Sequence, residues 1–186
     1  MCRRTPCFTA HATPPRLARA DVAQMAHTGR VTRLRARSNV NGPFLMTRAA
    51  VPPMLRAGWG RIVNISMNHS TMCRAGFSPY GPSKAALESE TIIWAQDLHG
   101  TGVTVNALLP GGATLTGMIP DTVPASVRSR LLDPAIMVPP LLWLISSAAD
   151  ALTGCRVTAN RWEDGNPLAA VERAGWHDAT VGQPAS

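Results

Sequence analysis

The chain has 186 residues, of which 45% are hydrophobic and 16% charged, which is typical of a globular protein with one sizeable core. No apolar run reaches the length of about 18 residues that a membrane-spanning helix needs, so the composition excludes one. The net charge of +7 comes from residues 1–38, which argues against a nucleic-acid-binding face on the neutral remainder.

Residues 1–38 form a basic segment with eight arginines and a single acid, Asp21. No period of 3.6 or 2 is sustained there, which predicts a poorly ordered segment with a short helix around Leu17–Met25. Arginine-rich arms occur in organelle-targeting and nucleic-acid-binding segments, so this role stays open as one hypothesis. The scarcity of serine and the lack of aromatic residues between the arginines argue against it.

Regular structure is predicted from Asn39 onwards. A helical pattern runs through Leu55, interrupted by Pro52 and Pro53, which should kink or restart the helix before Gly58 ends it. The elements expected next are a strand over 61–66, a loop over 67–79, a helix over 80–98 and a strand over 103–109. The order continues with irregular chain over 113–135, a buried helix over 138–149 and a strand over 156–159. A tail follows over 161–186, in which residues 168–174 could form a helix.

Strands and helices thus alternate, and the strands are almost continuously apolar. This pattern is typical of an α/β fold in which a parallel sheet is covered by helices on both faces. Only three strands are predicted, so we expect a partial Rossmann-like, doubly wound sheet. The strand over 61–66 is expected to have an unpaired edge and a bare apolar flank.

Tyr80 and Lys84 are the only tyrosine and the only lysine of the chain. Their spacing puts both side chains on one face of the predicted helix. A tyrosine with a pKa near 10 is a poor acid–base catalyst at pH 7, and a neighbouring ammonium group should lower that pKa. The sequence therefore predicts an acid–base pair. The alternative is a surface tyrosine beside a solvated lysine, and the four-residue spacing alone is a weak signal.

The pair lies within a series of blocks that runs from Asn39 to Ala159. In order they are Asn39-Val40-Asn41-Gly42, Gly60-Arg61-Ile62-Val63-Asn64-Ile65-Ser66, Tyr80-Gly81-Pro82-Ser83-Lys84-Ala85-Ala86, Val105-Asn106 with Pro110-Gly111, and Thr153-Gly154. This series resembles the short-chain dehydrogenase/reductase family. The resemblance implies hydride transfer between NAD or NADP and a small carbonyl or alcohol compound, and it implies subunit association.

The resemblance also implies roles for individual residues. Tyr80 would be the general acid or base, and Lys84 would also bind the ribose of the nicotinamide. Asn39 would hold a proton-relay water, although a helix N-cap explains an asparagine there equally well. The nicotinamide end of the cofactor would contact Pro110, Gly111 and Thr116, of which the first two also suit a plain turn.

Two departures from the family pattern put the activity in question. Met67 stands thirteen residues before Tyr80, where the family has a catalytic serine, and methionine has no hydroxyl to donate. Ser66 is its neighbour but should point to the opposite face, whereas His69 or Ser70 could compensate. The sequence also lacks the pattern T-G-x-x-x-G-x-G that holds the cofactor's pyrophosphate in the family.

These departures predict a truncated domain over 39–160, without the N-terminal Gly-rich βαβ half, between a basic segment 1–38 and a tail 161–186. Three functions remain open. The chain is a weak or inactive oxidoreductase, or a non-catalytic fragment that associates with full-length homologues, or a protein whose basic segment 1–38 serves in targeting or nucleic-acid binding. Whether the chain is an active enzyme therefore stays undecided at this point.

The cysteines add a prediction about location. Cys2, Cys7, Cys73 and Cys155 match no zinc-binding or redox spacing, so no metal site is expected. Because no secretory segment precedes them, reduced thiols in the cytoplasm are the expectation.

Overall fold

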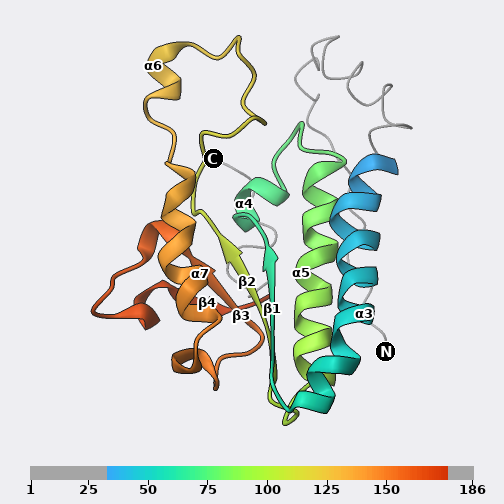
Figure 1. The fold of residues 1–186 in the computed structure, drawn as a ribbon. Helices are drawn as coiled ribbons and strands as arrows, with labels where there is room; N and C mark the ends of the chain where they lie inside the picture. Colours follow the sequence, from blue (N-terminus) through green and yellow to red (C-terminus); the bar gives the residue numbers. More distant parts are fainter. Residues whose placement is uncertain (1–32, 176–186) are drawn as a thin grey trace, which may run out of the picture.

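The structure is a computed structural model that describes residues 33–175. Its centre is a four-stranded sheet of order β1-β2-β3-β4 (Figure 1). The strands are β1 (Gly60–Ile65), β2 (Val103–Leu109), β3 (Cys155–Thr158) and β4 (Val171–Arg173). The first three run parallel, and β4 pairs with β3 in the antiparallel direction. The α/β fold with a mostly parallel open sheet is therefore confirmed.

Helices cover both faces of this sheet. The larger ones are α3 (Gly42–Ala57), α5 (Tyr80–Asp97) and α7 (Val138–Leu144), with short turns α4 (His69–Met72) and α6 (Ala125–Arg128). Single turns complete the set: the π-helical η1 (Arg37–Asn41) and the 3-10 turns η2 (Pro134–Met137), η3 (Ser147–Ala149), η4 (Ala159–Arg161) and η5 (Pro167–Ala170). In Figure 1, α3 and α5 lie on one face and α7 on the other. Within residues 33–175, no helix is long and apolar enough to cross a membrane.

The helix that leads into the sheet is longer than the sequence predicts. It is helical from residue 33 through η1 to the end of α3, and Pro52 and Pro53 do not restart it. It ends at Gly58, whose φ of 62° is a left-handed conformation that favours glycine. Asn39 lies inside this helical run, so its alternative reading as a helix N-cap is wrong. The short helix predicted at Leu17–Met25 lies outside the described residues.

Strand β2 forms the middle of the core, and all seven of its residues are buried. One apolar cluster packs Val103 and Val105 against Ala95 and Leu98 at the end of α5. A second cluster lies around Leu108 on the α7 side; its other buried members are Leu144, Val157 and Ala170. The apolar run is buried on both faces, as the alternation of strands and helices predicts.

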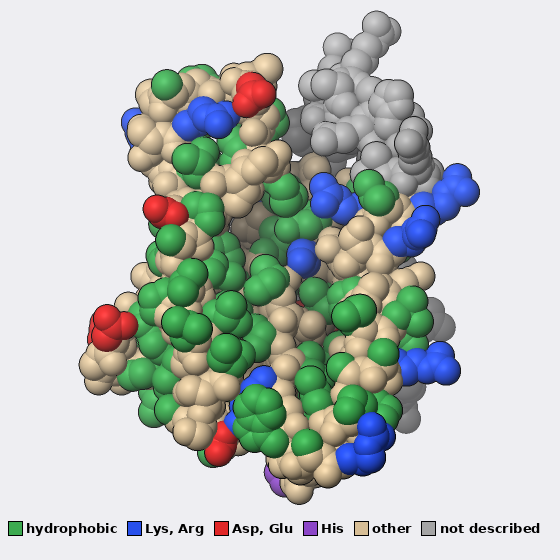
Figure 2. Space-filling model, in the orientation of Figure 1, with side chains coloured by type: hydrophobic (Ala, Val, Ile, Leu, Met, Phe, Trp, Pro, Cys, Tyr) green, Lys and Arg blue, Asp and Glu red, His purple; other side chains and the backbone are tan. Residues whose placement is uncertain are grey.

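Two predictions about the C-terminal third are wrong. Residues 168–174 form the turn η5 and the strand β4 rather than a helix, because Val171 pairs with Val157 of β3. The helix α7 ends at Leu144 instead of residue 149, and it is not buried all round, since Leu142 is 59% exposed. Figure 2 shows hydrophobic side chains gathered on the surface over α7.

Candidate active site

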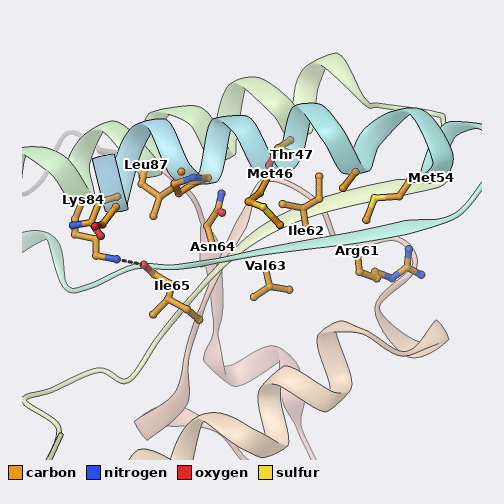
Figure 3. A pocket seen from close by; sticks show the side chains of 15 residues that line it. Met46, Thr47, Met54, Arg61, Ile62, Val63, Asn64, Ile65, Lys84 and Leu87 are labelled. Atoms are coloured by element: carbon orange, nitrogen blue, oxygen red, sulfur yellow. Dashed lines mark hydrogen bonds between the residues drawn. The ribbon is translucent and has the colours of Figure 1, made fainter. Parts of the chain in front are cut away.

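Tyr80 and Lys84 occupy the first turns of α5, beside the carboxyl end of β1. Lys84 is only 8% exposed, and its Nζ donates a hydrogen bond of 2.7 Å to the carbonyl oxygen of Ile65, the last residue of β1 (Figure 3). The ammonium group is therefore held where the strand ends. Carboxyl ends of parallel strands are the usual place for a ligand in an open α/β sheet.

The electrostatics around Tyr80 differ from the expectation. Burial raises the pKa of Tyr80 above its ordinary value, and the nearby charge of Arg35 opposes this rise. The Arg35 guanidinium lies 4.9 Å from the centre of the Tyr80 ring, whereas Lys84 Nζ lies at 5.9 Å. Burial and the charge of Arg35 lower the pKa of Lys84. The expectation that Lys84 lowers the pKa of Tyr80 is therefore wrong. Burial raises this pKa more than positive charge lowers it, and the charge that opposes the rise is that of Arg35.

Replacing Arg35 by glutamine should raise the pKa of Tyr80 further, because the phenolate then loses a stabilising positive charge. The absorbance of the phenolate can be titrated without ambiguity, since Tyr80 is the only tyrosine. Arg48→Gln on α3 is the matched control and should leave the titration unchanged. A lower or unchanged Tyr80 pKa in Arg35→Gln would show that Arg35 does not act on the phenol.

Asn39 is joined to the pair through Ser83. Its Nδ2 donates to Ser83 Oγ at 2.9 Å, and that hydroxyl donates to the Tyr80 carbonyl oxygen at 2.7 Å. The two bonds fix the π-helical turn η1 against the first turn of α5. The structure thus brings together three of the residues that the sequence singles out, and it adds Ser83, which is buried.

The other predicted residues follow β2. Gly111 has a φ of 87°, and a Cβ there would collide with the side chain of Asn160, so glycine is required. Its carbonyl oxygen accepts from Asn68 Nδ2 at 3.1 Å, which ties the loops after β1 and β2 together. Pro110 precedes it and is half-buried. Thr116 is exposed, and among the described residues its hydroxyl accepts only from the amide of Met118.

The residues at and near the position of the family's catalytic serine are engaged in other contacts. Ser66 is buried and donates to Glu88 Oε2 at 2.5 Å, so its hydroxyl is directed to the interior. The backbone of Met67 is fixed as well, because its carbonyl oxygen accepts from Arg156 Nη2 at 2.9 Å. His69 is engaged too: its Nε2 contacts Arg156 Nη1, and burial followed by the Arg156 charge lowers its pKa. Because a guanidinium group has no acceptor, the His69 ring nitrogen is the acceptor in this contact.

These contacts define a buried ionic cluster that the sequence reasoning missed. Glu88 is fully buried, and its Oε1 lies 3.3 Å from Nε of Arg156, which is 2% exposed. The signal that could have revealed Glu88 is its spacing, since it follows Lys84 by one helical turn on the same face. Arg35 was also missed, because it lies in the segment assigned to the basic arm.

Comparisons with known proteins show the family of this chain. The model of the short chain dehydrogenase family matches residues 20–125, a match that begins before Asn39. The oxidoreductase YciK of Escherichia coli (strain K12) is 33% identical over 116 residues, which are 62% of this chain and 45% of that protein. The D-beta-hydroxybutyrate dehydrogenase of Rhizobium meliloti (strain 1021) is 35% identical over 92 residues, which are 50% of this chain and 35% of that protein.

Solved structures give the same result. A short chain dehydrogenase of Shigella flexneri, complexed with NADP, superposes with a TM-score of 0.59 at 31% identity. The superposition covers 66% of this chain and 50% of that one. The chain therefore spans about half of this structure and less than half of the two relatives named above.

Proposed function

The chain belongs to the short-chain dehydrogenase family, and we propose that it carries the acid–base half of an NAD(P)-dependent oxidoreductase site for a small carbonyl or alcohol compound. The observation that carries this proposal is the place of Tyr80 and Lys84 at the carboxyl end of β1, with Lys84 Nζ bound to the Ile65 carbonyl oxygen. Two similar structures that are complexed with NADP and NADPH support the choice of cofactor.

In the direction of reduction, the Tyr80 hydroxyl donates its proton to the carbonyl oxygen of the substrate. Its raised pKa keeps the phenol protonated at neutral pH, which suits a proton donor. The charge of Arg35 then stabilises the phenolate that remains. When bound, the reduced nicotinamide supplies the hydride that forms the new C–H bond of the alcohol.

The residues present fit one end of this cofactor. Tyr80, Lys84, Pro110, Gly111 and Thr116 would hold the nicotinamide and its ribose, and the buried Lys84 ammonium supplies a fixed donor for ribose hydroxyls. The pyrophosphate end has no such support among residues 33–175, where no long helix begins at a Gly-rich turn after a strand. We therefore propose weak cofactor binding through the nicotinamide end.

The activity of the chain as it stands should be weak for a second reason. With Met67 in the serine position and Ser66 bound to Glu88, one donor to the substrate oxygen is absent from the described site. A donor of this kind is worth on the order of 3 kcal/mol in the transition state. The second candidate function is the hypothesis that the chain acts without catalysis by associating with full-length homologues.

Nucleotide binding tests the proposal. In a fluorescence titration of NADH and NADPH against the full chain, we expect saturable binding with a Kd on the order of 1 mM. Lys84→Met should weaken this binding, because the ammonium group is lost while the volume of the side chain is kept. Arg56→Gln, at the far end of α3, is the matched control and should bind as the wild type does.

Saturable binding that depends on Lys84 would support the oxidoreductase site. An absence of binding at millimolar nucleotide, or equal binding by Lys84→Met, would contradict it and leave the non-catalytic candidate.

A further inference from the structure

A small polar cleft lies beyond the carboxyl ends of three strands, because Asn68, Gly111 and Asn160 follow β1, β2 and β3 and all border it. Its volume is about 300 Å³, the lower end of the roughly 300–1,000 Å³ that is typical of ligand pockets. We call it the polar cleft, and its polar side chains include those of Asn68, Arg156, Thr158, Asn160, Arg161 and Glu172.

The polar cleft is separate from the cavity that Lys84 lines. That larger cavity lies between α3 and β1 (Figure 3), and the two share no lining residue. Of the residues proposed for catalysis and cofactor binding, Gly111 alone borders the polar cleft. A ligand in the cleft can therefore bind without contacting the acid–base pair.

The hydroxyl group of Thr158 in β3 is the strongest indication of a ligand. The residue is only 6% exposed, and its hydroxyl forms no hydrogen bond within residues 33–175. The oxygen is not sealed in the core, since it still reaches solvent, and the polar cleft is the opening beside it. Buried hydroxyl groups are nearly always hydrogen-bonded, to protein or to another molecule. A ligand in the cleft would supply the partner.

The charged side chains of the cleft also keep hydrogen-bonding groups available. Glu172 Oε1 lies 3.6 Å from Arg156 Nε, and Glu172 Oε2 lies 3.6 Å from Arg161 Nη1. Both separations are too long for hydrogen bonds, and within the described chain the side chains of Glu172 and Arg161 form none. Asn160 donates to the Gly111 carbonyl oxygen at 3.2 Å and keeps its amide oxygen as an acceptor. The cleft thus offers donors from Arg161 and acceptors from Glu172 and Asn160.

The charges around the cleft balance, which favours a neutral ligand. Glu88 contacts Arg156 from behind at 3.3 Å, so two carboxylates accompany the two guanidinium groups of Arg156 and Arg161. Burial and the charge of Arg156 lower the pKa of His69, so this ring adds no positive charge at neutral pH. A small anion held by Arg161 would also meet the carboxylate of Glu172, and a cation held by Glu172 would meet both arginines.

From these observations we propose that the polar cleft binds a small neutral polyol with hydroxyl groups on neighbouring carbon atoms. A hydroxyl group both donates and accepts hydrogen bonds. One hydroxyl would donate to Glu172 while its neighbour accepts from Arg161, and a third would pair with the hydroxyl of Thr158. This inference does not depend on catalysis or on cofactor binding, because the acid–base pair does not line the cleft.

Ligand-observed NMR with xylitol and the full chain tests the proposal. We expect saturable binding with a Kd on the order of 1 mM. A pentanediol with hydroxyl groups only at its two ends keeps the carbon chain and should bind about tenfold more weakly. Added salt should leave the Kd of xylitol nearly unchanged, because the ligand carries no charge.

Variants of the chain locate the binding. Thr158→Val keeps the shape of the side chain and removes the hydroxyl, and it should weaken xylitol binding about fivefold or more, as should Glu172→Gln. The matched controls are Thr47→Val, in the larger cavity, and the exposed Glu163→Gln, and both should bind as the wild type does. Lys84→Met should also bind xylitol normally, which separates this proposal from the nicotinamide site.

The proposal is overturned by no binding of xylitol at concentrations on the order of 10 mM, or by equal binding of the pentanediol. It is also overturned if Thr158→Val and Glu172→Gln bind xylitol as their controls do. Because Glu172 is 46% exposed, its variant carries the test should Thr158→Val fail to fold. Binding of acetate that Arg161→Gln abolishes, without binding of xylitol, would assign the cleft to an anion and refute a neutral ligand.

Discussion

Replacing Met67 by serine should raise the rate of carbonyl reduction about a hundredfold. The position lies two residues after the end of β1, and its backbone is fixed by the hydrogen bond from Arg156 to the Met67 carbonyl oxygen. A serine there would therefore add a hydroxyl donor on a backbone that is already held. One donor to a developing oxyanion contributes about 3 kcal/mol, which corresponds to roughly a hundredfold in rate.

The control for this variant is Met67→Ala, which removes the methionine without adding a donor. It should leave the rate close to that of the wild type, so that a gain in Met67→Ser reports the hydroxyl itself. Equal rates for the serine and alanine variants would show that the position does not face the substrate oxygen. Both variants should keep the wild-type stability, because Met67 is only partly buried.

Replacing Tyr80 by phenylalanine should abolish most of the catalysis in the wild type and in Met67→Ser. The change removes the proton donor and keeps the ring that stacks against Arg35. A positioned acid–base group contributes about 10²–10⁴-fold to the rate, and a loss in this range is expected. Circular dichroism should be unchanged, since the phenol oxygen supports no hydrogen bond among those found within residues 33–175.

Much of the fold could be predicted from local pattern. β2 matches its predicted bounds of 103–109, and α5 matches its prediction to within one residue, because a continuous apolar run and a long helical period are strong signals. β4 could not be predicted in this way. Its three residues, Val171–Arg173, have no strand pattern of their own and become a strand by pairing with β3.

The residues of the candidate site also differ in whether the sequence could predict them. Tyr80 and Lys84 are recognisable because their spacing is local and their residue types are unique in the chain. Arg35 and Arg156 act across long sequence separations, on Tyr80 and on Met67, and no local pattern reports such contacts. The pKa of Tyr80 was predicted with the wrong sign because burial depends on the packed structure.

We propose that Tyr80 acts as the acid–base group of an oxidoreductase site. Deuteride transfer tests it most directly. The full chain is incubated with NADPH that carries deuterium at C4, or with the corresponding NADH, and with a small ketone. Mass spectrometry then detects deuterium in the alcohol, which makes slow turnover measurable.

We expect labelled alcohol from the wild type and a loss of on the order of a hundredfold or more in Tyr80→Phe. Equal labelling by the two chains, or no label from the wild type and from Met67→Ser, would contradict it.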